Sequence, residues 1–379
     1  MSQNLSRKPI LAIISDTSMY IKDEMFVFEP VLREVRSFSN LFNKIIWLGF
    51  NRSMLPPLNA KLATSSKNIE LLAIKPCGGK SYIKKIGVIL LIPYYFLKII
   101  RLVKKSDVIH TRGPSIPAML TIFISFLYPN KKYWHKYAGN WQLESKAISY
   151  RFQKWLLLKR IPGKVIVSQK NKLDPPHILS WLNPCLTEKE ITINKKLGIK
   201  KYYKDKFVLC FIGRLEEAKG FPALLDAISN LNQIHCIDKV HFVGEKTEPY
   251  ILNNNKSPND IEIIFHGTLD RLRLNQIYAD SHFIILPSKS EGFPKVLAEA
   301  SSFGCIPIIP PIPSIISQVN EKNKNGIILP DITSQGILNT IMGLHKIKNE
   351  LSTFSVNAME NARKFSYEKY YEQILNNIL

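Results

Sequence analysis

The 379-residue sequence is poor in cysteine and lacks any long apolar run. Its five cysteines are odd in number and widely spaced, and no Cys-x-x-Cys pair occurs. We therefore expect neither a disulfide framework nor a zinc ribbon, and a reducing cytoplasmic compartment fits this usage best. Glycine (17) and proline (23) are ordinary in number, which excludes a collagen-like or linker-dominated chain.

Apolar segments long enough for a secretion signal or a membrane span are also missing. Ile10–Ile14 ends at Ser15-Asp16 and is too short for a signal peptide. Ile86–Leu97 is uncharged, but Pro93 interrupts it and it is shorter than the roughly 20 residues that span a bilayer. We expect a soluble protein that is able to touch membranes.

Acidic residues are scarce: 30 Asp and Glu stand against 52 Lys and Arg, for a formal net charge of +22. Residues 1–190 hold 30 of the basic residues and 11 of the acidic ones, so nearly all of the excess lies in the first half. This asymmetry predicts that the first half meets an anionic partner, which is a membrane leaflet, a nucleic acid or a phosphorylated substrate.

Apolar, β-rich runs alternate with amphipathic helical patterns from end to end, which predicts parallel α/β layering. The stretch Asp174–Lys206 holds three prolines and a dense patch of lysines, and we interpret it as a connection between two domains. The strands expected before it are 9–15, 44–48, 107–110 and 164–168, the last taken as the end of the first sheet. The strands expected after it are 207–212, 239–243, 261–265, 283–286, 306–309 and 326–329.

Two strand–loop–helix units in the second half carry the candidate chemistry. In the first, the strand 207–212 runs into a loop that begins Gly213-Arg214 and ends Lys219-Gly220. Its two cations project from the carboxyl end of a strand, where ligands bind in open α/β sheets. A guanidinium fork beside an ammonium suits a diphosphate, and two solvated cations flanking an ordinary loop are the alternative.

The second unit carries two glutamates on either side of a helix start. Glu291 lies in the loop before the helix that Pro294 opens, and Glu299 lies on its second turn. The N–H groups and dipole of the helix N-terminus between them suit a phosphate. Glu291 would accept hydrogens from sugar hydroxyls and Glu299 from a ribose. The alternative is a surface helix residue and a loop charge.

Together these residues resemble the retaining glycosyltransferases of family four, which have the GT-B fold. The stretch with Phe265-His266-Gly267 and Leu274 to Asp280 also resembles the family's segment that lines the nucleobase pocket, and the match covers about residues 207–310. The matching residues are Gly213-Arg214 and Lys219-Gly220 for the family's phosphate site, and Glu291 and Glu299 for its Glu-x7-Glu motif.

The resemblance implies an α/β protein with two facing Rossmann-like domains and a C-terminal helix that crosses back to the first. We expect an acceptor-binding domain over 1–185, a nucleotide-sugar-binding domain over 186–360, and the helix over 361–379. The implied activity is transfer of a hexose-type sugar, with retention of anomeric configuration, from a UDP- or GDP-linked donor. The implied acceptor is a saccharide or a lipid-linked molecule of cell-surface polysaccharide or glycolipid biosynthesis. We expect a cytoplasmic enzyme, peripheral on the inner face of the membrane.

The resemblance also assigns roles. Arg214 and Lys219 bind the donor diphosphate, Glu299 holds the ribose, and Glu291 meets the donor sugar; Glu291, Arg214 and Lys219 are the expected catalytic residues. Because no Asp-x-Asp triplet occurs, and Asp260-Ile-Glu262 is the nearest approach, we expect no metal and no cofactor, so the cations and the helix end stabilise the leaving group. The other donor-binding residues expected are Gly213, Gly292, Phe293, Pro294, Lys295 and Val296.

The first half departs from the family pattern, because Asp16–Met19, after the first strand, contains no glycine. The acceptor-side candidates are His135, Asn140 and Arg112. For His135 the alternative is a core histidine whose hydrogen bonds are satisfied, and for Arg112 it is a solvated turn. The segment Lys80–Lys105 is basic around an aromatic middle, which is typical of anionic membrane surfaces; a core-packed helix with a solvated basic side is the alternative.

Two other functions remain open at this point. A sugar-nucleotide epimerase of the same architecture would need acid and base groups together in its site, and the sequence shows no such cluster. A nucleic-acid-binding protein is suggested by net charge alone, and no binding motif supports it, so we expect no nucleic-acid partner.

Overall fold

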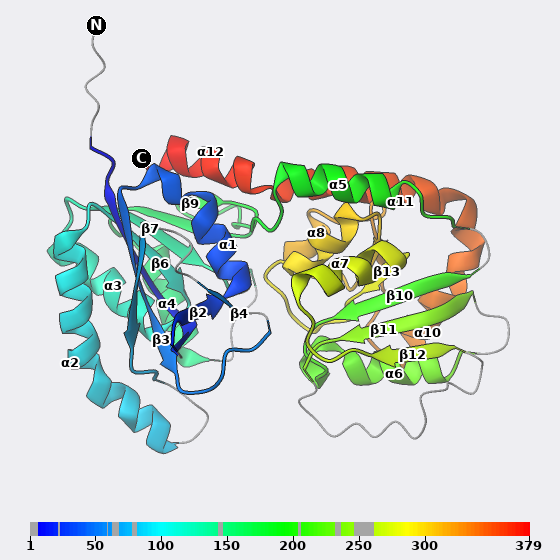
Figure 1. Ribbon diagram of the computed structural model, residues 1–379, viewed down its shortest axis with the longest axis horizontal. Helices are drawn as coiled ribbons and strands as arrows, with labels where there is room; N and C mark the ends of the chain where they lie inside the picture. Colours follow the sequence, from blue (N-terminus) through cyan, green and yellow to red (C-terminus); the bar gives the residue numbers. More distant parts are fainter. Residues whose placement is uncertain are drawn as a thin grey trace, which may run out of the picture. The chain divides into compact units, whose positions relative to one another are not determined.

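The computed structural model describes residues 7–21, 23–58, 60–62, 68–77, 82–142, 147–203, 206–231, 236–245 and 261–379, with the backbone alone for 82–86. Lys80 and Asp260, which the sequence brought to notice, lie outside the described residues. The chain divides into two compact units (Figure 1). They comprise Met1–Leu182 with Tyr370–Leu379, and Asn183–Lys369.

A parallel sheet with the strand order β5-β3-β1-β6-β7-β8-β9 forms the centre of the first unit, and β2 and β4 extend one end of β1 in antiparallel pairing. Its strands are β1 (Ile10–Ile21), β2 (Met25–Phe28), β3 (Lys44–Arg52), β4 (Ala60–Leu62), β5 (Ile69–Ile74), β6 (Val108–Gly113), β7 (Lys132–Tyr137), β8 (Lys164–Val167) and β9 (Ile178–Ser180). Its helices are α1 (Glu29–Ser37), η1 (Ser39–Leu41), α2 (Tyr82–Lys105), α3 (Ile116–Leu127) and α4 (Ile148–Leu158).

Alternation along β1 explains why helices cover both faces of this sheet. Leu11 and Ile13 point into a core shared with α1, while Ala12 and Ile14 point into a core shared with α2 and α3. The first of these cores also contains Tyr370, from the end of the sequence, so the chain returns to the first unit as expected. Among the described residues, no helix is long and apolar enough to cross a bilayer.

The second unit contains a parallel sheet with the order β12-β11-β10-β13-β14-β15. Its strands are β10 (Phe207–Ile212), β11 (Ile237–Val243), β12 (Glu262–Phe265), β13 (Phe283–Ile285), β14 (Ile306–Ile309) and β15 (Ile327–Ile328). Its helices are α5 (Glu188–Gly198), η2 (Glu217–Lys219), α6 (Phe221–Ser229), α7 (Arg271–Asp280), α8 (Lys295–Ser302), α9 (Pro313–Ile316), α10 (Ser334–Gly343), η3 (Leu344–Ile347), α11 (Lys348–Ala362) and η4 (Arg363–Phe365), and α12 (Tyr367–Asn377) leads back to the first unit.

Both sheets have the strand order of a Rossmann-like fold, in which the first strand lies in the middle and the chain then winds outward to either side. The expected α/β class with two Rossmann-like units is thereby confirmed. The strands predicted for the second unit agree with those observed to within two residues at either end. Buried parallel strands produce continuous apolar runs, which is why these were readable.

Two expectations for the first half were wrong. The first strand does not end at Ser15 but continues to Ile21, where it pairs with β2 instead of entering a turn. Residues 164–168 are not the end of the sheet, because β9 pairs with β8. The boundary between the two units, between Leu182 and Asn183, lies within the stretch Asp174–Lys206. This stretch also contains β9 and α5, and α5 is opened by a capping box in which Thr187 and Glu190 bond to each other's backbone N–H groups.

Candidate active site

The two loops selected from the sequence meet where the strand order of the second sheet reverses. Its strand order reverses between β10 and β13, and ligands of open α/β sheets bind outside the carboxyl ends of the strands at such a point. The loop after β10 spans 213–220, and the loop after β13 spans 286–294. The backbone N–H of Lys289 donates to the carbonyl of Ala218 at 3.1 Å, so the loops are joined directly.

Glycines make this close approach possible. Gly220 has φ +72°, and a Cβ there would lie 2.0 Å from the carbonyl oxygen of Pro287. Gly244, after β11, has φ +147°, and a Cβ there would lie 1.8 Å from the carbonyl oxygen of Gly213. Side chains at either position would both strain the backbone and push the neighbouring loop away.

Lys219 and Glu291 form the central ion pair of the site. Lys219 Nζ lies 2.5 Å from Glu291 Oε1, and the two side chains are 25% and 12% exposed. The backbone carbonyl of Glu291 also accepts a hydrogen bond from Ser314 Oγ at 2.8 Å, which fixes the loop that carries the carboxylate. The two residues predicted to act on the diphosphate and on the sugar are therefore side by side.

Arg214 lies further out than Lys219. Its guanidinium is 2.8 Å from Glu216 Oε1, and its side chain is 60% exposed. An exposed ion pair of this kind contributes little to stability, so the arginine is able to exchange this partner for an anionic ligand at small cost. Its position at the carboxyl end of β10 agrees with the sequence prediction of a cation there.

Glu299 is held from two sides. Its Oε1 lies 3.0 Å from Arg271 Nη1, and its Oε2 accepts a bond from the Tyr278 hydroxyl at 3.4 Å. Arg271 also approaches Glu190 on α5, with 3.5 Å between Nε and Oε1. Since Glu299 is only 9% exposed, it is not the surface helix residue of the alternative interpretation.

These neighbours keep both partners of Glu299 in one protonation state. Burial lowers the pKa of Arg271, but the charges of Glu299 and Glu190 raise it more, so the guanidinium stays protonated. Burial and the charge of Glu299 raise the pKa of Tyr278 well above its ordinary value, so its hydroxyl remains a donor. The carboxylate is thus presented by two fixed donors.

The start of α8 lies between the two glutamates. Pro294 is the N-cap residue, and Gly292, Lys295 and Val296 are half-buried around it. The ring of Phe293 is buried and stacks on Phe365 at a centroid distance of 4.4 Å, so this residue anchors the loop through its side chain.

Ser288 adds a polar group to the same loop. Its Oγ is buried and has no hydrogen-bond partner among the described residues. Such a group retains hydrogen-bonding capacity for a ligand, because buried hydroxyls are normally paired. Nothing in the local sequence distinguished it from an ordinary loop serine.

Two residues important to the geometry, Arg271 and Ser314, were missed from the sequence. Arg271 lies seven residues before Tyr278, and this spacing places both on one face of α7, which is the signal that could have found it. Ser314 could not be found this way, because its contact with Glu291 joins residues that are distant in the sequence.

The acceptor-side candidates lie in the first unit, where two of them are engaged internally. His135 is 1% exposed, and its ring nitrogens lie 3.0 Å from Thr111 Oγ1 and 3.3 Å from the Pro162 carbonyl. Burial lowers its pKa to about 4, so the ring is neutral. His135 therefore has the environment of a satisfied core histidine, and its acceptor role stays a prediction.

Arg112 is bound to a buried carboxylate. Its two terminal nitrogens contact the oxygens of Glu34 at 2.6 and 3.3 Å, and Lys136 Nζ contacts the same carboxylate at 2.7 Å. This arrangement differs from a solvated turn. Asn140 Oδ1 accepts a bond from the Gln142 N–H at 3.0 Å, at the end of β7. Acceptor roles for Arg112 and Asn140 also stay predictions.

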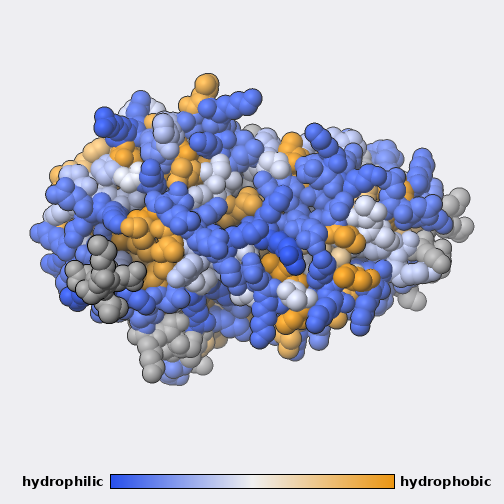
Figure 2. Space-filling model, turned by 90° about the horizontal axis from the view of Figure 1, so that it is seen from above, coloured by the Kyte–Doolittle hydropathy of each residue, from blue (hydrophilic) through white to orange (hydrophobic). Residues whose placement is uncertain are grey.

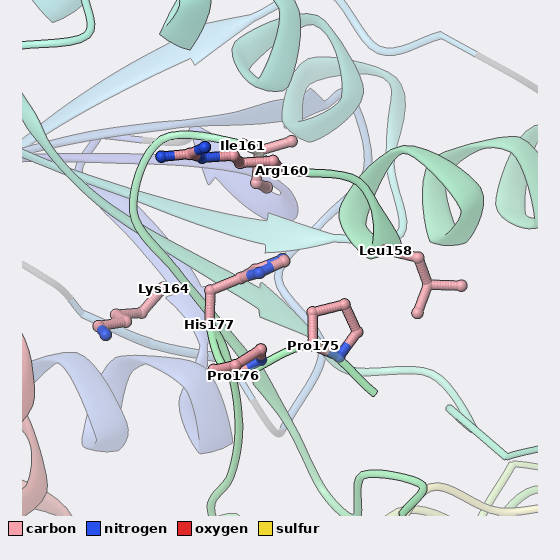
Figure 3. Close-up of a pocket in the computed structure, with 7 residues that line it drawn as sticks. All are labelled: Leu158, Arg160, Ile161, Lys164, Pro175, Pro176 and His177. Carbon is pink, nitrogen blue, oxygen red and sulfur yellow. The ribbon is translucent and has the colours of Figure 1, made fainter. Parts of the chain in front are cut away.

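Two further features of the described residues concern metal ligands and a pocket in the first unit. No group of three or more His, Cys, Asp or Glu side chains able to hold a metal ion occurs in the described part of the chain. A pocket of about 560 Å³ lies in the first unit, where Arg160 precedes β8, Lys164 is the first residue of β8, and His177 precedes β9 (Figure 3). It lies at the amino ends of these strands, and no sequence pattern pointed to it.

The match to a known protein family lies within the second unit. Residues 193–364, somewhat less than half of the chain, match the family described as glycosyl transferases group 1. An uncharacterized 41.2 kDa protein in the cps region of Klebsiella pneumoniae is 23% identical over 190 residues, which are 46% of this chain and 46% of that protein. Glycogen synthase of Petrotoga mobilis is 27% identical over 215 residues, 52% of this chain and 42% of the synthase.

The solved structures extend the likeness to the whole fold. The Anabaena protein HepE, solved in complex with UDP and glucose, superposes with a TM-score of 0.65 at 14% identity, and the match covers 97% of this chain and 98% of HepE. The fold is therefore of the GT-B type. The alignments with the two curated relatives span somewhat less than half the length of each of them.

Proposed function

We propose that this protein is a glycosyltransferase that moves a hexose-type sugar from a nucleotide-sugar donor to an acceptor, with retention of anomeric configuration. The observation that carries the proposal is the Lys219–Glu291 ion pair, followed on α8 by the buried Glu299, at the point where the strand order of the second sheet reverses. The group 1 match to the same segment supports it.

In this proposal each polar group has a separate task. Lys219 and Arg214 bind the donor diphosphate, together with backbone N–H groups at the start of α8. Glu299, already positioned by Arg271 and Tyr278, accepts hydrogen bonds from the ribose hydroxyls. Glu291 accepts hydrogen bonds from the donor sugar.

The chemistry needs charge stabilisation more than it needs a protein base. As the bond from the sugar to the phosphate breaks, negative charge grows on the diphosphate and positive charge on the sugar ring. Lys219 and Arg214 stabilise the first, and the carboxylate of Glu291 favours the second. A phosphate oxygen of the donor takes the acceptor proton on the same face, which gives retention. This donor set leads us to propose a metal-independent reaction.

The acceptor and its location form the finer part of the proposal. We propose a saccharide or lipid-linked acceptor of cell-surface polysaccharide or glycolipid synthesis, bound by the first unit. Its candidate residues are Asn140, Arg112 and His135. The positive excess of residues 1–190 supports an anionic partner such as a phospholipid surface. A sugar-nucleotide epimerase is less favoured for two reasons. The family that the second unit matches is one of glycosyl transferases, and the ion-paired site does not supply the acid and base pair that an epimerase needs.

Thermal melting with UDP, GDP and ADP in excess EDTA tests the donor site. A ligand at 100 times its Kd adds about 2.7 kcal/mol of stability, which is a measurable rise in Tm. We expect one nucleotide to raise the Tm of the wild type and to have much less effect on Glu299→Gln. Glu262→Gln, an exposed glutamate on β12, is the matched control and should keep the full shift. An equal shift in Glu299→Gln and in the control would remove Glu299 from the nucleotide site.

A further inference from the structure

Three neighbouring helices of the first unit expose large apolar side chains to solvent. The surface seen in Figure 2 is mainly hydrophilic, with apolar side chains gathered in separate patches. Contacts link α2 to α3 and α3 to α4, so the three helices form one layer over the sheet. We call their exposed apolar surface the α2–α4 face. Its members are Ile89, Leu90 and Leu97 on α2, Phe123, Phe126 and Leu127 on α3, and Ile148, Phe152 and Trp155 on α4.

Aromatic rings form the continuous part of this face. Phe123 stacks on Phe152 at 6.3 Å, and Phe152 stacks on Trp155 at 5.7 Å, with exposures of 41%, 43% and 50%. Along α4, Ile148, Phe152 and Trp155 follow one helical stripe. A contiguous exposed aromatic surface of this kind marks an interaction site, because isolated apolar residues on a surface need no explanation but a patch does.

The charged residues of the three helices have one sign. The sequences of α2, α3 and α4 contain no Asp or Glu. Their described basic residues are Lys98, Arg101, Lys104 and Lys105 on α2, and Arg151 and Lys154 on α4. Lys159, one residue beyond α4, lies 5.0 Å from the centre of the Trp155 ring. An apolar, aromatic surface on helices whose charged residues are all basic is complementary to an anionic bilayer.

A basic pocket continues the face at the end of α4. It has a volume of about 560 Å³, and Arg160 and Lys164 line it together with His177, Pro175 and Pro176 (Figure 3). Leu158, the last residue of α4, also lines it. Two cations at a pocket beside exposed aromatic rings match the phosphate of a lipid headgroup whose chains lie next to those rings.

We propose that the α2–α4 face seats the chain on an anionic lipid bilayer. Phe123, Phe152 and Trp155 lie at the boundary of headgroups and acyl chains, and the pocket with Arg160 and Lys164 takes a headgroup phosphate. The proposal rests on the proposed function, which names a membrane as the partner. The residues of the face all belong to the first unit, and none of them is a residue of the donor site. It would bring a lipid-linked acceptor to the enzyme by confining both to one surface.

Trp155 reports on this contact directly. It is 50% exposed, whereas the other four tryptophans, Trp47, Trp134, Trp141 and Trp181, are at most 5% exposed. We expect vesicles of phosphatidylcholine and phosphatidylglycerol with brominated acyl chains to quench tryptophan fluorescence, and vesicles of phosphatidylcholine alone to have little effect. Trp155→Phe should still sediment with the anionic vesicles but lose most of the quenching.

Variants of the face separate its apolar and basic contributions. Phe152→Ser combined with Trp155→Ser should lower vesicle partitioning by about tenfold or more. Arg101→Gln combined with Lys105→Gln should lower it by about fivefold for each charge removed. Leu375→Ser, which changes a 48% exposed apolar residue on α12, is the matched control and should leave partitioning unchanged.

Three outcomes would overturn the proposal. Sedimentation without quenching would mean that another surface binds lipid. Equal quenching by neutral and anionic vesicles would remove the role of the basic residues. If the chain bound neither kind of vesicle, light scattering showed a dimer and fluorescence showed Trp155 to be shielded in it, the face would be assigned to self-association. The rise in Tm with the nucleotide that stabilises the wild type distinguishes these results from failure of the donor site, because it should persist in every variant of the face.

Discussion

The ion pair between Lys219 and Glu291 leads to a prediction about Glu291→Gln. Glu291 neutralises the ammonium that is proposed to bind the donor diphosphate, so a nucleoside diphosphate without its sugar meets a neutral pair. Glutamine keeps the shape of the side chain and an oxygen able to accept the bond from Lys219, but it removes the negative charge. We therefore expect Glu291→Gln to bind UDP more tightly than the wild type while transferring sugar more slowly.

The size of the effect follows from distance and exposure. Two unit charges 4 Å apart interact by about 1 kcal/mol in water and about 4 kcal/mol at an effective dielectric constant of 20. The Lys219 and Glu291 side chains are 25% and 12% exposed, which places the pair between these limits. Because the diphosphate lies further from the carboxylate than Lys219 does, we expect a gain of about 1 kcal/mol, or about fivefold in Kd.

Turnover should fall by about 10²–10³-fold, the usual loss when one group that stabilises transition-state charge is removed. Titration calorimetry with UDP in EDTA, at low and at high salt, measures the change in affinity, and product analysis with a labelled donor measures turnover. Lys219→Met is the opposite control and should weaken UDP binding. A tenfold weaker binding of UDP by Glu291→Gln would refute the reasoning, since it would place Glu291 among the nucleotide contacts.

Three further predictions concern stability. Gly220→Ala should destabilise the fold by about 1 kcal/mol more than Gly267→Ala, measured by urea unfolding, because both have positive φ but only the first would meet a carbonyl, at 2.0 Å. Burial lowers the pKa of His135 from 6.5 to about 4, so the unfolded state binds more protons between these values, and stability that is complete above pH 6.5 is lost as the pH falls. The free energy of unfolding of His135→Gln, measured by urea unfolding, should therefore fall less between pH 7 and pH 5 than that of the wild type, by about 2 kcal/mol. Arg112→Met should cost about 2–4 kcal/mol in the same unfolding assay because it leaves the buried Glu34 with a weaker set of donors, and an unchanged midpoint would contradict the role given to this pair.

The parts of the fold that could be predicted are those with a local signal. Buried parallel strands such as β10 and β14 are unbroken apolar runs, and their bounds were predicted without error. The end of β1 was mispredicted because Asp16-Thr17-Ser18 has the composition of a turn, and the pairing that keeps the strand extended, with β2 and with β3, joins residues distant in the sequence. Three-residue β9 has too little sequence for any pattern.

The candidate site shows the same division. Spacing alone brought out Glu291 and Glu299, because eight residues around a helix start are a local pattern. The partner of Glu299 was not predictable, since Arg271 reaches it from another helix and also contacts Glu190 on α5. The environment of Arg112 was not predictable either, because its bond to the buried Glu34 joins residues 78 positions apart in the sequence.

The return of the chain to the first unit has a consequence for the order of folding during synthesis. Tyr370, Ile374 and Ile378 belong to the same core as Leu11 and Ile13, and the Tyr370 hydroxyl contacts Glu34 across 336 positions of sequence. Closing such a long loop is slow. While the ribosome translates the second unit, the apolar residues of the first unit that pack against Tyr370, Ile374 and Ile378 stay uncovered. Chaperones that shield nascent chains would therefore find their longest-lived target on the α1 side of the first sheet.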